Sequence, residues 1–573
     1  MTQHPAVNIG QCSLAGQKSV NQDFHGALVP EGDDLLHKGI VVALADGIST
    51  SAVSAQAAEM AVKALMTDYY CTSQAWTVKT SASRVISAMN AWLHAENRRA
   101  RIGDMDRGFV TTLSALILKG RTAHLFHVGD SRIFRLSGSS LEQLTTDHRV
   151  ILSEYESCLG RALGLDRDVE IDYRAIELAP GDTFLLATDG VGECVTGKDV
   201  TAVLAAHGGD LDAAARALCH IALERGVSDN LTAQFVRAGR IAEESAEKPE
   251  SGSEMLPLAP LLSEGQEFDG YRILRNLHTN HRSHIWLAEI IGSGEHVVLK
   301  LPAVELASEP EFLRRFLLEE WTGRRINSVH VLKVLNRPRK YTYLVTEHVE
   351  GQTLAQWMVD NPRASLTDMR AIVSQVVKGL RAFHRMEMVH QDIRPENIMI
   401  DRAGTVKLVD FGSVRVGGAE ETSAGHDTAL PAGAIQYAAP EVLAGHPGTP
   451  ASDMFSLGVM TYQMLTGHLP YGATLARAAG KAKTPRLAYR ALTGWRPDIP
   501  DWVDGAIAKA VHPDHWKRYE VLSEFQHDLS HPNPAFGGRA FIPLSKRNPV
   551  MFWQVLTLIL LFALLAMLAR HGI

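Results

Sequence analysis

The chain has 573 residues, which at about 100–200 residues per domain allows three to five domains. Hydrophobic residues make up 46% and charged residues 21% of the chain, which is ordinary globular usage and excludes a disordered chain or a coiled-coil rod. The formal net charge of −7 provides no broad basic surface, so no nucleic-acid partner is expected.

The chain begins with MTQHPAVNIG, which has no basic region followed by an apolar one, so no signal peptide is expected. Over residues 1–238, short β-rich runs such as 40–44 and 113–118 alternate with helical stretches such as 54–70. Interleaved strand and helix periods predict a mixed domain. The five cysteines all precede residue 220 and form no CxxC pair, which favours reduced thiols over disulfides or a zinc site.

Short aspartate-containing strings are spread through this first domain. They are NQD at 21–23, ADG at 45–47, VGDSR at 128–132, TDG at 188–190 and SDN at 228–230. Carboxylates at strand ends can converge on one point, and oxygen-only ligands suit Mg²⁺ or Mn²⁺. Taken singly, each aspartate is better explained as a turn or helix-cap residue, because Asp-Gly is a common turn signal.

The ordered set of strings resembles the metal-dependent protein phosphatases of type 2C over residues 1–240. The match rests on KSVNQD at 18–23, ADG at 45–47, HVGDSR at 127–132, LLATDG at 185–190 and GVSDN at 226–230. The resemblance implies a β-sandwich with flanking helices and a centre of two Mn²⁺ or Mg²⁺ ions, which would activate a water for attack on a phosphoester.

The resemblance also implies a role for each residue of this centre. Asp46 would bridge the two ions, and the carbonyl of Gly47 would bind one of them. Asp189 and Asp229 would complete the second ion's site, Asp23 would orient the attacking water, and Asp130 would serve a third, more labile ion.

Four positions depart from the phosphatase pattern. The phosphate-gripping arginine is replaced by Lys18, which keeps a cation and loses the bidentate fork. Ser49 and Thr50 stand where two glycines are expected, and Ile48 offers no acid for the leaving group. We expect these changes to affect substrate affinity and the general-acid step, and to leave the metal centre intact.

Residues 239–267 read as an acidic flexible linker, and residues 268–532 carry a second ordered set. Its members are a strand ending at Lys300, a helix with Glu319, MVHQDIRPEN at 388–397, VDFG at 409–412 and AAPE at 438–441. This set resembles the eukaryotic-like serine/threonine protein kinases, and it implies a bilobal domain that uses ATP and Mg²⁺.

In the kinase resemblance, Lys300 holds the α- and β-phosphates and is positioned by Glu319. Asn397 and Asp410 bind Mg²⁺. Asp392 would accept the proton of the substrate hydroxyl, and Arg394 would contact the γ-phosphate. Glu347 and His348 would form the adenine-facing hinge.

Two features depart from the kinase pattern. The phosphate loop at 277–286 reads LHTNHRSHIW and has no glycine, and the catalytic loop has Gln391 in place of the usual arginine. The missing glycines favour an alternative in which a nucleotide-binding pseudokinase regulates an active phosphatase. The retained Lys300, Asp392, Asn397 and Asp410 favour an active kinase. A third alternative, in which both domains are inactive, is disfavoured because clustered carboxylates without cations repel each other.

Residues 533–549 are rich in Pro, Gly, Lys and Arg and form an expected juxtamembrane spacer before an uncharged stretch at 550–569. Twenty such residues span about 30 Å as a helix, which predicts a transmembrane segment. The alternative is a buried helix of a soluble core. Lys546 and Arg547 precede the stretch, which favours a single-pass anchor in the inner (cytoplasmic) membrane with the preceding domains in the cytoplasm.

The sequence therefore predicts an α+β chain that carries a phosphatase-like domain, a kinase-like domain and a C-terminal anchor. We expect a membrane-tethered signalling enzyme that phosphorylates and dephosphorylates serine and threonine residues of protein substrates.

Overall fold

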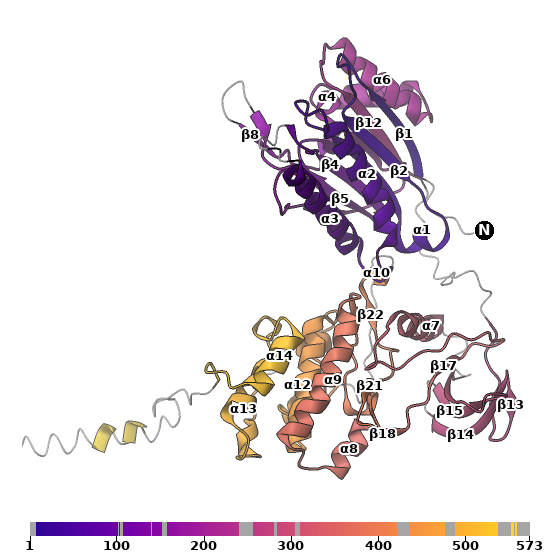
Figure 1. The fold of residues 1–573 in the computed structure, drawn as a ribbon, viewed down its shortest axis with the longest axis vertical. Coiled ribbons are helices and arrows are strands. Elements are labelled where there is room, and N and C mark those ends of the chain that lie inside the picture. The colour runs from indigo at the N-terminus through magenta and orange to yellow at the C-terminus, as the bar shows by residue number, and fades with distance from the viewer. Residues whose placement is uncertain are drawn as a thin grey trace, which may run out of the picture. The chain divides into compact units, whose positions relative to one another are not determined.

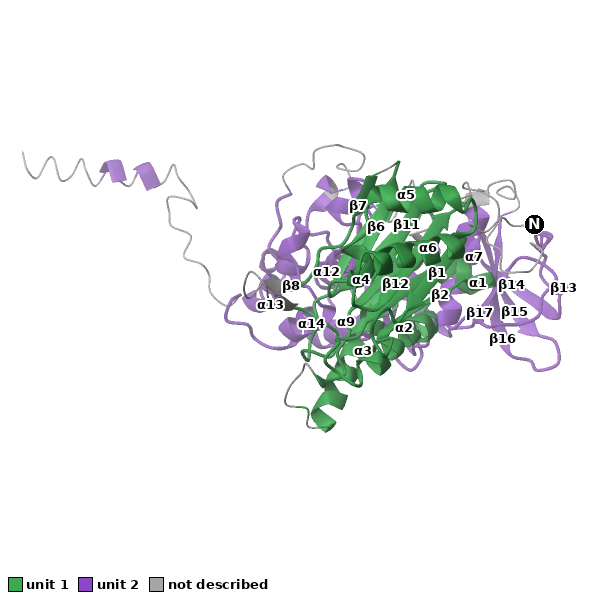
Figure 2. Ribbon diagram, turned by 90° about the horizontal axis from the view of Figure 1, so that it is seen from above, with its two compact units in different colours: residues 1–255, 386–388, 416–426 green, residues 256–385, 389–415, 427–573 purple. Residues whose placement is uncertain are grey.

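The computed structural model describes residues 7–100, 102, 107–138, 140–151, 157–239, 256–279, 283–303, 310–420, 435–475, 487–536, 552–554 and 556–558. The chain divides into two units (Figure 2). Unit 1 comprises residues 1–255, 386–388 and 416–426, and unit 2 comprises the remainder. Unit 1 thus contains the whole of the first predicted domain, and unit 2 contains most of the second.

Two five-stranded antiparallel sheets form the centre of the first domain (Figure 1). The first sheet has the order β1 (Val7–Leu14), β12 (Leu231–Ala238), β11 (Thr183–Ala187), β6 (Arg132–Ser137) and β7 (Ser140–Gln143). The second has the order β10 (Asp172–Glu177), β5 (Thr122–Val128), β4 (Leu113–Lys119), β3 (Ile40–Asp46) and β2 (Asp23–Leu28).

Strand β3 shows why this domain has apolar runs where an alternating pattern might be expected. Ile40, Val42 and Leu44 belong to the core between the two sheets, and the residues between them, such as Val41 and Ala43, belong to a second core under the helices. Because successive side chains of a strand point to opposite faces, a strand covered on both faces is apolar throughout.

Helices cover the outer face of each sheet. The second sheet is covered by α2 (Ser54–Cys71) and α3 (Val78–Arg99), and the first by α4 (Asp189–Gly192), α5 (Gly197–Ala206) and α6 (Leu211–Glu224). Helix α5 begins with a capping box between Thr196 and Asp199, which satisfies backbone N–H groups of its first turn. The remaining elements are α1 (Gly32–Lys38) and the pair β8 (Arg149–Ile151) and β9 (Ser157–Leu159). The predicted sandwich with flanking helices is therefore observed.

The smaller lobe of the second domain is a meander of consecutive antiparallel strands with one helix. The strands are β13 (Glu267–Phe268), β14 (Tyr271–Thr279), β15 (Ser283–Ile290), β16 (His296–Pro302) and β17 (Leu344–Glu347), in that order across the sheet. Helix α7 (Pro310–Arg325) follows β16 along the chain. Irregular pairing interrupts β14 between Ile273 and His278, and the centre of the glycine-free loop at 280–282 lies outside the described residues.

The larger lobe is mainly helical. Its helices are α8 (Leu354–Asp360), α9 (Leu366–His384), α11 (Pro440–Leu443), α12 (Pro450–Thr466), α13 (Asp501–Ala510) and α14 (Leu522–Ser530). Helix α10 (Gly417–Glu420) belongs to unit 1. Its strands are β18 (Gly351–Thr353), β19 (Met388–Val389), β20 (Ile398–Asp401), β21 (Val406–Leu408) and β22 (Arg415–Val416). Short 3₁₀ turns are η3 (Pro395–Asn397), η4 (Gly472–Thr474), η6 (Leu492–Gly494) and η7 (His515–Lys517).

Helix α12 forms the centre of this lobe and is buried on nearly every side. It begins at a capping box between Thr449 and Ser452, with Pro450 at the first helical position, and it ends at Gly467 with φ +71°. Proline at the start and a left-handed glycine at the end are the usual boundaries of a helix. A helix buried on nearly all sides needs no polar outer face, and the polar residues Ser452, Asp453 and Ser456 of α12 are themselves buried.

The predicted transmembrane segment 550–569 falls mostly outside the described residues. Residues 552–554 and 556–558 are helical. Among the residues that the structure describes, no helix is both long and apolar enough to cross a membrane. The expected transmembrane helix is therefore not supported by the described structure.

Candidate active sites

Two aspartates of the first domain lie opposite each other on adjacent strands. Asp23 begins β2 and pairs with Asp46 at the end of β3. The Oδ2 atom of Asp23 accepts hydrogen bonds from the hydroxyls of Thr188 (3.0 Å) and Thr232 (2.7 Å), while its buried Oδ1 has no hydrogen-bond partner in the described part of the chain. Like charges directly across a ladder are destabilising, so this pair needs a cation between or beside its members.

Three further aspartates come from loops at the ends of strands. Asp130 follows β5 after Gly129, Asp189 begins α4 after β11, and Asp229 precedes β12. Gly129 has φ +114°, and a Cβ there would lie 2.5 Å from Cβ of Thr112. This position therefore requires glycine to turn the chain toward the site.

The electrostatics of Asp23, Asp46 and Asp189 indicate that the five carboxyls lie close together. Burial, with the charges of Asp23, Asp189, Asp130 and Asp229, raises the pKa of Asp46 well above its usual range. Burial raises the pKa of Asp23 to about 6 and, together with Asp130 and Asp229, that of Asp189 to about 6. Carboxylates that protonate so readily by themselves fit a site for divalent cations, whose charge would offset the mutual repulsion.

The structure also places the other predicted residues of this site. Lys18 forms an ion pair with Asp229, and its Nζ donates to Ser49 Oγ at 2.5 Å. A Cβ on Gly47 would lie 2.6 Å from the carbonyl oxygen of Ser54, so only glycine fits where the backbone leaves β3. The structure brings Lys18, Asp23, Asp46, Asp130, Asp189 and Asp229 into one neighbourhood.

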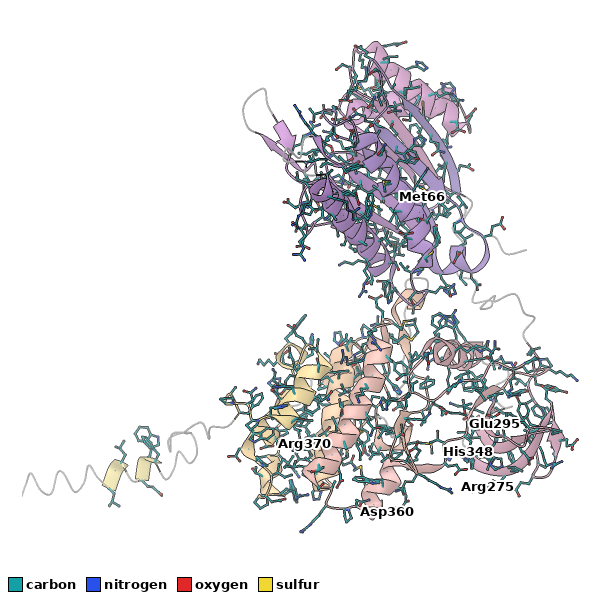
Figure 3. All side chains as sticks on the ribbon, viewed as in Figure 1. Met66, Arg275, Glu295, His348, Asp360 and Arg370 are labelled. Carbon is teal, nitrogen blue, oxygen red and sulfur yellow. The ribbon has the colours of Figure 1, made fainter. Side chains whose placement is uncertain are left out.

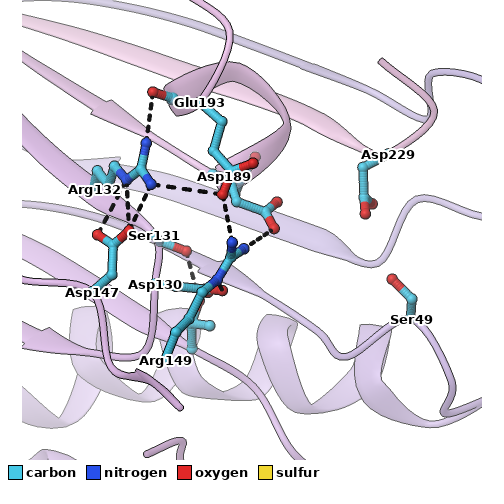
Figure 4. Close-up of polar contacts among 12 residues, drawn as sticks. Ser49, Asp130, Ser131, Arg132, Asp147, Arg149, Asp189, Glu193 and Asp229 are labelled. Atoms are coloured by element: carbon cyan, nitrogen blue, oxygen red, sulfur yellow. Dashed lines mark hydrogen bonds and ion pairs between the residues drawn. The ribbon is translucent and has the colours of Figure 1, made fainter. Parts of the chain in front are cut away.

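One residue of this neighbourhood was missed by sequence reasoning. Arg149, the first residue of β8, forms ion pairs with Asp130 and Asp189 (Figure 4). The string TTDHR at 145–149 follows the VGDSR string after residues 133–144, and it has no spacing pattern that marks its arginine. Only the tertiary structure shows that Arg149 reaches the carboxylates.

In the second domain, a buried lysine connects the two lobes. Lys300 on β16 donates to both carboxylate oxygens of Glu319 on α7 at 2.8 Å and to Oδ1 of Asp410 at 3.0 Å. Burial acts to lower the pKa of Lys300, but Asp410 and Glu319 outweigh it and raise that pKa. Lys300 in turn lowers the pKa of Asp410 to about 2, so both ends of the pair are charged.

The predicted proton acceptor lies in a second cluster in the larger lobe. Asn397 donates to Oδ2 of Asp392 at 2.8 Å and to its backbone oxygen at 3.0 Å, and Arg394 lies 3.3 Å from Oδ1 of Asp392. Burial raises the pKa of Asp392, and Arg394 opposes that shift. A carboxylate with a raised pKa, held by an amide and a guanidinium, is suited to take a proton from a hydroxyl.

Buried polar contacts fix the loop that carries Asp392. Asp453 on α12 accepts from the backbone N–H groups of His390 and Gln391, each at 2.9 Å. Gln391 has φ +64°, a strained conformation for a residue with a side chain, and the two hydrogen bonds hold it there. Arg518, whose side chain is fully buried, makes a bidentate ion pair with Glu441 at 2.6 and 2.8 Å.

The predicted adenine-facing residues lie at the end of the last strand of the smaller lobe. Glu347 is the last residue of β17, and its carboxylate bonds to Lys407 (2.7 Å) and to the backbone N–H of Lys333 (2.8 Å). His348 directly follows β17, and Figure 3 labels it together with Arg275 of β14 and Glu295, which precedes β16. Burial, with nearby His296 and Arg275, lowers the pKa of His348, which is therefore neutral at pH 7.

Comparisons with known families match both domains. A family model of protein phosphatase 2C matches residues 12–235, and one of the protein kinase domain matches residues 288–530. The kinase part is similar to the serine/threonine-protein kinase PrkC of Bacillus subtilis, at 29% identity over 272 residues that cover 46% of this chain and 41% of PrkC. It is also similar to the serine/threonine-protein kinase PknA of Mycobacterium tuberculosis, at 33% identity over 44% of this chain and 59% of PknA. The chain thus spans less than two thirds of these curated relatives.

Solved structures resemble each part of the chain. PppA of Pseudomonas aeruginosa matches 40% of this chain and 97% of its own, with 26% identity and a TM-score of 0.35. The PknI kinase domain of Mycobacterium tuberculosis matches 47% of this chain and 98% of its own, with 24% identity and a TM-score of 0.38.

Proposed function

The chain joins a protein phosphatase 2C domain to a serine/threonine protein kinase domain, and from this premise we propose that it is a bifunctional signalling enzyme. In this proposal the kinase domain phosphorylates serine and threonine residues of proteins with ATP, and the phosphatase domain hydrolyses such phosphoesters. The observation that supports the proposal is that the aspartates of the first domain lie close to one another, and that the charged residues of the second domain form the Lys300–Glu319 and Asp392–Asn397 contacts.

The phosphatase half of the proposal rests on the aspartate cluster. Asp46, Asp189 and Asp229, with the carbonyl of Gly47, would hold two Mn²⁺ or Mg²⁺ ions. Such ions supply a water of lowered pKa in line with the phosphorus. Asp23 is held by two threonine hydroxyls and keeps one buried oxygen with no hydrogen-bond partner in the described chain, which suits it to orient that water.

Lys18 supplies the cation on the substrate side of the same site. Its amine already contacts Asp229 and Ser49, so it lies where a phosphate bound beside Asp229 would meet it. A lysine binds phosphate as a point charge without the two parallel hydrogen bonds of an arginine. We therefore expect weaker ground-state binding of phosphoprotein than an arginine would give.

The kinase half rests on the two clusters around Lys300 and Asp392. Lys300, held by Glu319, would contact the α- and β-phosphates of ATP, while Asn397 and Asp410 would bind Mg²⁺. Asp392 would accept the proton of the substrate hydroxyl, with Arg394 beside the γ-phosphate. These contacts favour an active kinase over a pseudokinase, because both the Lys300–Glu319 salt bridge and the Asn397–Asp392 hydrogen bond are present.

We further propose that residues 550–569 anchor the chain in the inner membrane as a single pass, with both catalytic domains in the cytoplasm. The support is the sequence alone: an uncharged stretch of bilayer length, preceded by Lys546 and Arg547. Membrane attachment would confine both activities to substrates near the bilayer.

A pulse–chase measurement tests the bifunctional proposal. The purified full-length chain is incubated with γ-labelled ATP, Mg²⁺ and Mn²⁺, and then ATP is removed with hexokinase and glucose. We expect label on serine or threonine during the pulse and its release as inorganic phosphate during the chase, with EDTA stopping the release. Absence of labelling in the pulse would refute the kinase activity, and hydrolysis of an aryl phosphate that persists in excess EDTA would refute the metal-dependent phosphatase.

A further inference from the structure

Arg149 lies among the carboxylates of the phosphatase site in a position that the chain builds firmly. The backbone N–H of the preceding His148 donates to the carbonyl of Gly129 at 2.8 Å, and the N–H of Gly129 donates to Nδ1 of His148 at 3.0 Å. On the other side, Asp147 is held by Arg132 through hydrogen bonds of 2.6–3.1 Å. The segment leading into β8 is therefore fixed directly beside Asp130.

Each nitrogen of the Arg149 guanidinium contacts a different carboxylate (Figure 4). Nε lies 2.7 Å from Asp130 Oδ2, Nη2 lies 2.8 Å from Asp189 Oδ2, and Nη1 lies 2.5 Å from Glu193 Oε1. The side chain of Asp130 is only 8% exposed. The planar guanidinium of Arg149 therefore acts as a fixed cation among three carboxylates and is not a simple surface ion pair.

Asp130 is the residue expected to serve a third, labile metal ion, and Asp189 lies close enough to feel its charge. In this chain that place is taken, because the Oδ2 atoms of both residues are bound to Arg149. The other oxygen of Asp189, Oδ1, is buried and has no hydrogen-bond partner within the described residues. Asp189 therefore presents one oxygen to Arg149 and keeps the other for the two-ion centre.

We propose that Arg149 is a built-in cation that replaces the third metal ion, so that this phosphatase site holds two ions and not three. The inference rests on the proposed phosphatase function and adds a positioning residue to it. Arg149 acts through Asp189: it neutralises part of the charge at the site and orients the carboxylate that faces the two-ion centre.

Arg149 also connects the β8–β9 strand pair to the carboxylates of the metal site. Arg149 pairs with Leu159 in that ladder, and it contacts Asp130 and Asp189 through its side chain. A soluble ion at the same place would make no covalent connection to this pair of strands. Loss of Arg149 would thus change the number of metal ions bound per chain as well as the rate of phosphoester hydrolysis. The number of bound ions is the more direct measurement.

The test is the number of Mn²⁺ ions bound per full-length chain in the absence of nucleotide, measured by equilibrium dialysis and elemental analysis. The parent is compared with Arg149→Ala, Arg149→Gln and Arg149→Lys, each checked for folding by circular dichroism. The matched control is Arg135→Ala, because Arg135 pairs with Asp182 at 2.7 Å and contacts none of the metal-site carboxylates. We expect one additional ion per chain in Arg149→Ala and Arg149→Gln, and the parental number in Arg149→Lys and Arg135→Ala.

Equal, non-zero numbers in the parent and in Arg149→Ala would overturn the inference while leaving the phosphatase proposal in place. The unaltered chain gives a second test that needs no folded variant: three ions per phosphatase site in the parent would also overturn it. If neither the parent nor Arg149→Ala binds Mn²⁺, the proposed metal-dependent phosphatase function fails and the inference fails with it.

Discussion

Asp23 and Asp46 are paired across β2 and β3, and the surrounding charges make their ionisation unfavourable when no cation is bound. Because burial raises the pKa of Asp23 to about 6, the folded state retains a proton that the unfolded state releases near its usual pKa of about 4. A group that binds its proton more tightly when folded makes the fold less stable as pH rises. The same sign applies to Asp189, whose pKa is also raised to about 6.

We therefore predict that the metal-free phosphatase domain loses stability between pH 4 and pH 7. In EDTA, the thermal transition that responds to Mn²⁺ should move to lower temperature over this range. The variant Asp46→Asn removes one ionising carboxyl, so its transition at pH 7.5 in EDTA should lie above that of the parent by about 2–4 °C for each kcal/mol recovered. Differential scanning calorimetry measures both effects.

Added Mn²⁺ should reverse the order of the two proteins, because an amide cannot replace a bridging carboxylate. The control is Asp68→Asn, which changes an exposed aspartate on α2 and should leave the transition unchanged in both conditions. A parental transition that does not move between pH 5 and pH 7.5 in EDTA would contradict the assigned electrostatics.

Sequence reasoning identified the site residues that occupy short motifs, and it failed where a residue reaches the site from elsewhere in the chain. Asp46, Asp130 and Asp189 follow strands in recognisable strings, so their order alone suggested a common site. Arg149 is placed by the approach of His148 to Gly129, a contact that no local pattern encodes.

At the scale of elements, the hydrophobic pattern predicted a strand well where its side chains are buried on both faces. The apolar run at 40–44 predicted β3, which is an inner strand of its sheet. Which faces of β3 pack against which layer depends on the order of strands in the sheet, and strand order is set by long-range pairing. For this reason the sandwich was expected from family resemblance and not from periodicity.

The start of α4 shows how closely two elements approach at the phosphatase site. A Cβ on Gly190 would lie 2.3 Å from the backbone oxygen of Asn230, next to Asp229. Gly190→Ala should therefore separate α4 from the start of β12 and destabilise the domain by about 1–3 kcal/mol. It should also weaken Mn²⁺ binding, because Asp189 and Asp229 would move apart. Calorimetry and a Mn²⁺ titration measure these changes.

Gly209→Ala provides the matched control. An added Cβ at Gly209 meets no atom within 4 Å, and that glycine does not have a positive φ. This variant should keep parental stability and Mn²⁺ affinity. If Gly190→Ala binds Mn²⁺ as tightly as Gly209→Ala does, the close approach of the two elements is not what holds the carboxylates together.

For the whole molecule, the proposed anchor predicts where the protein is found in the cell. A chain truncated after Leu544 lacks the apolar stretch and should move from the membrane fraction to the soluble fraction, with both activities retained, since the site residues all precede it. Protease added to intact spheroplasts should leave the catalytic domains of the full chain uncut. Digestion from outside would contradict the orientation, and a full-length chain in the soluble fraction would contradict the anchor.

The central claim is that one chain carries two independent and opposed active sites. The measurement that tests it most directly assays ATP-dependent self-labelling and aryl phosphate hydrolysis side by side in the full-length parent, Asp46→Ala and Asp392→Ala. We predict that Asp392→Ala loses labelling by at least about 100-fold and hydrolyses the aryl phosphate like the parent. Asp46→Ala should lose hydrolysis and accumulate more label than the parent. Parental labelling by Asp392→Ala, or loss of both activities in either folded variant, would contradict the account.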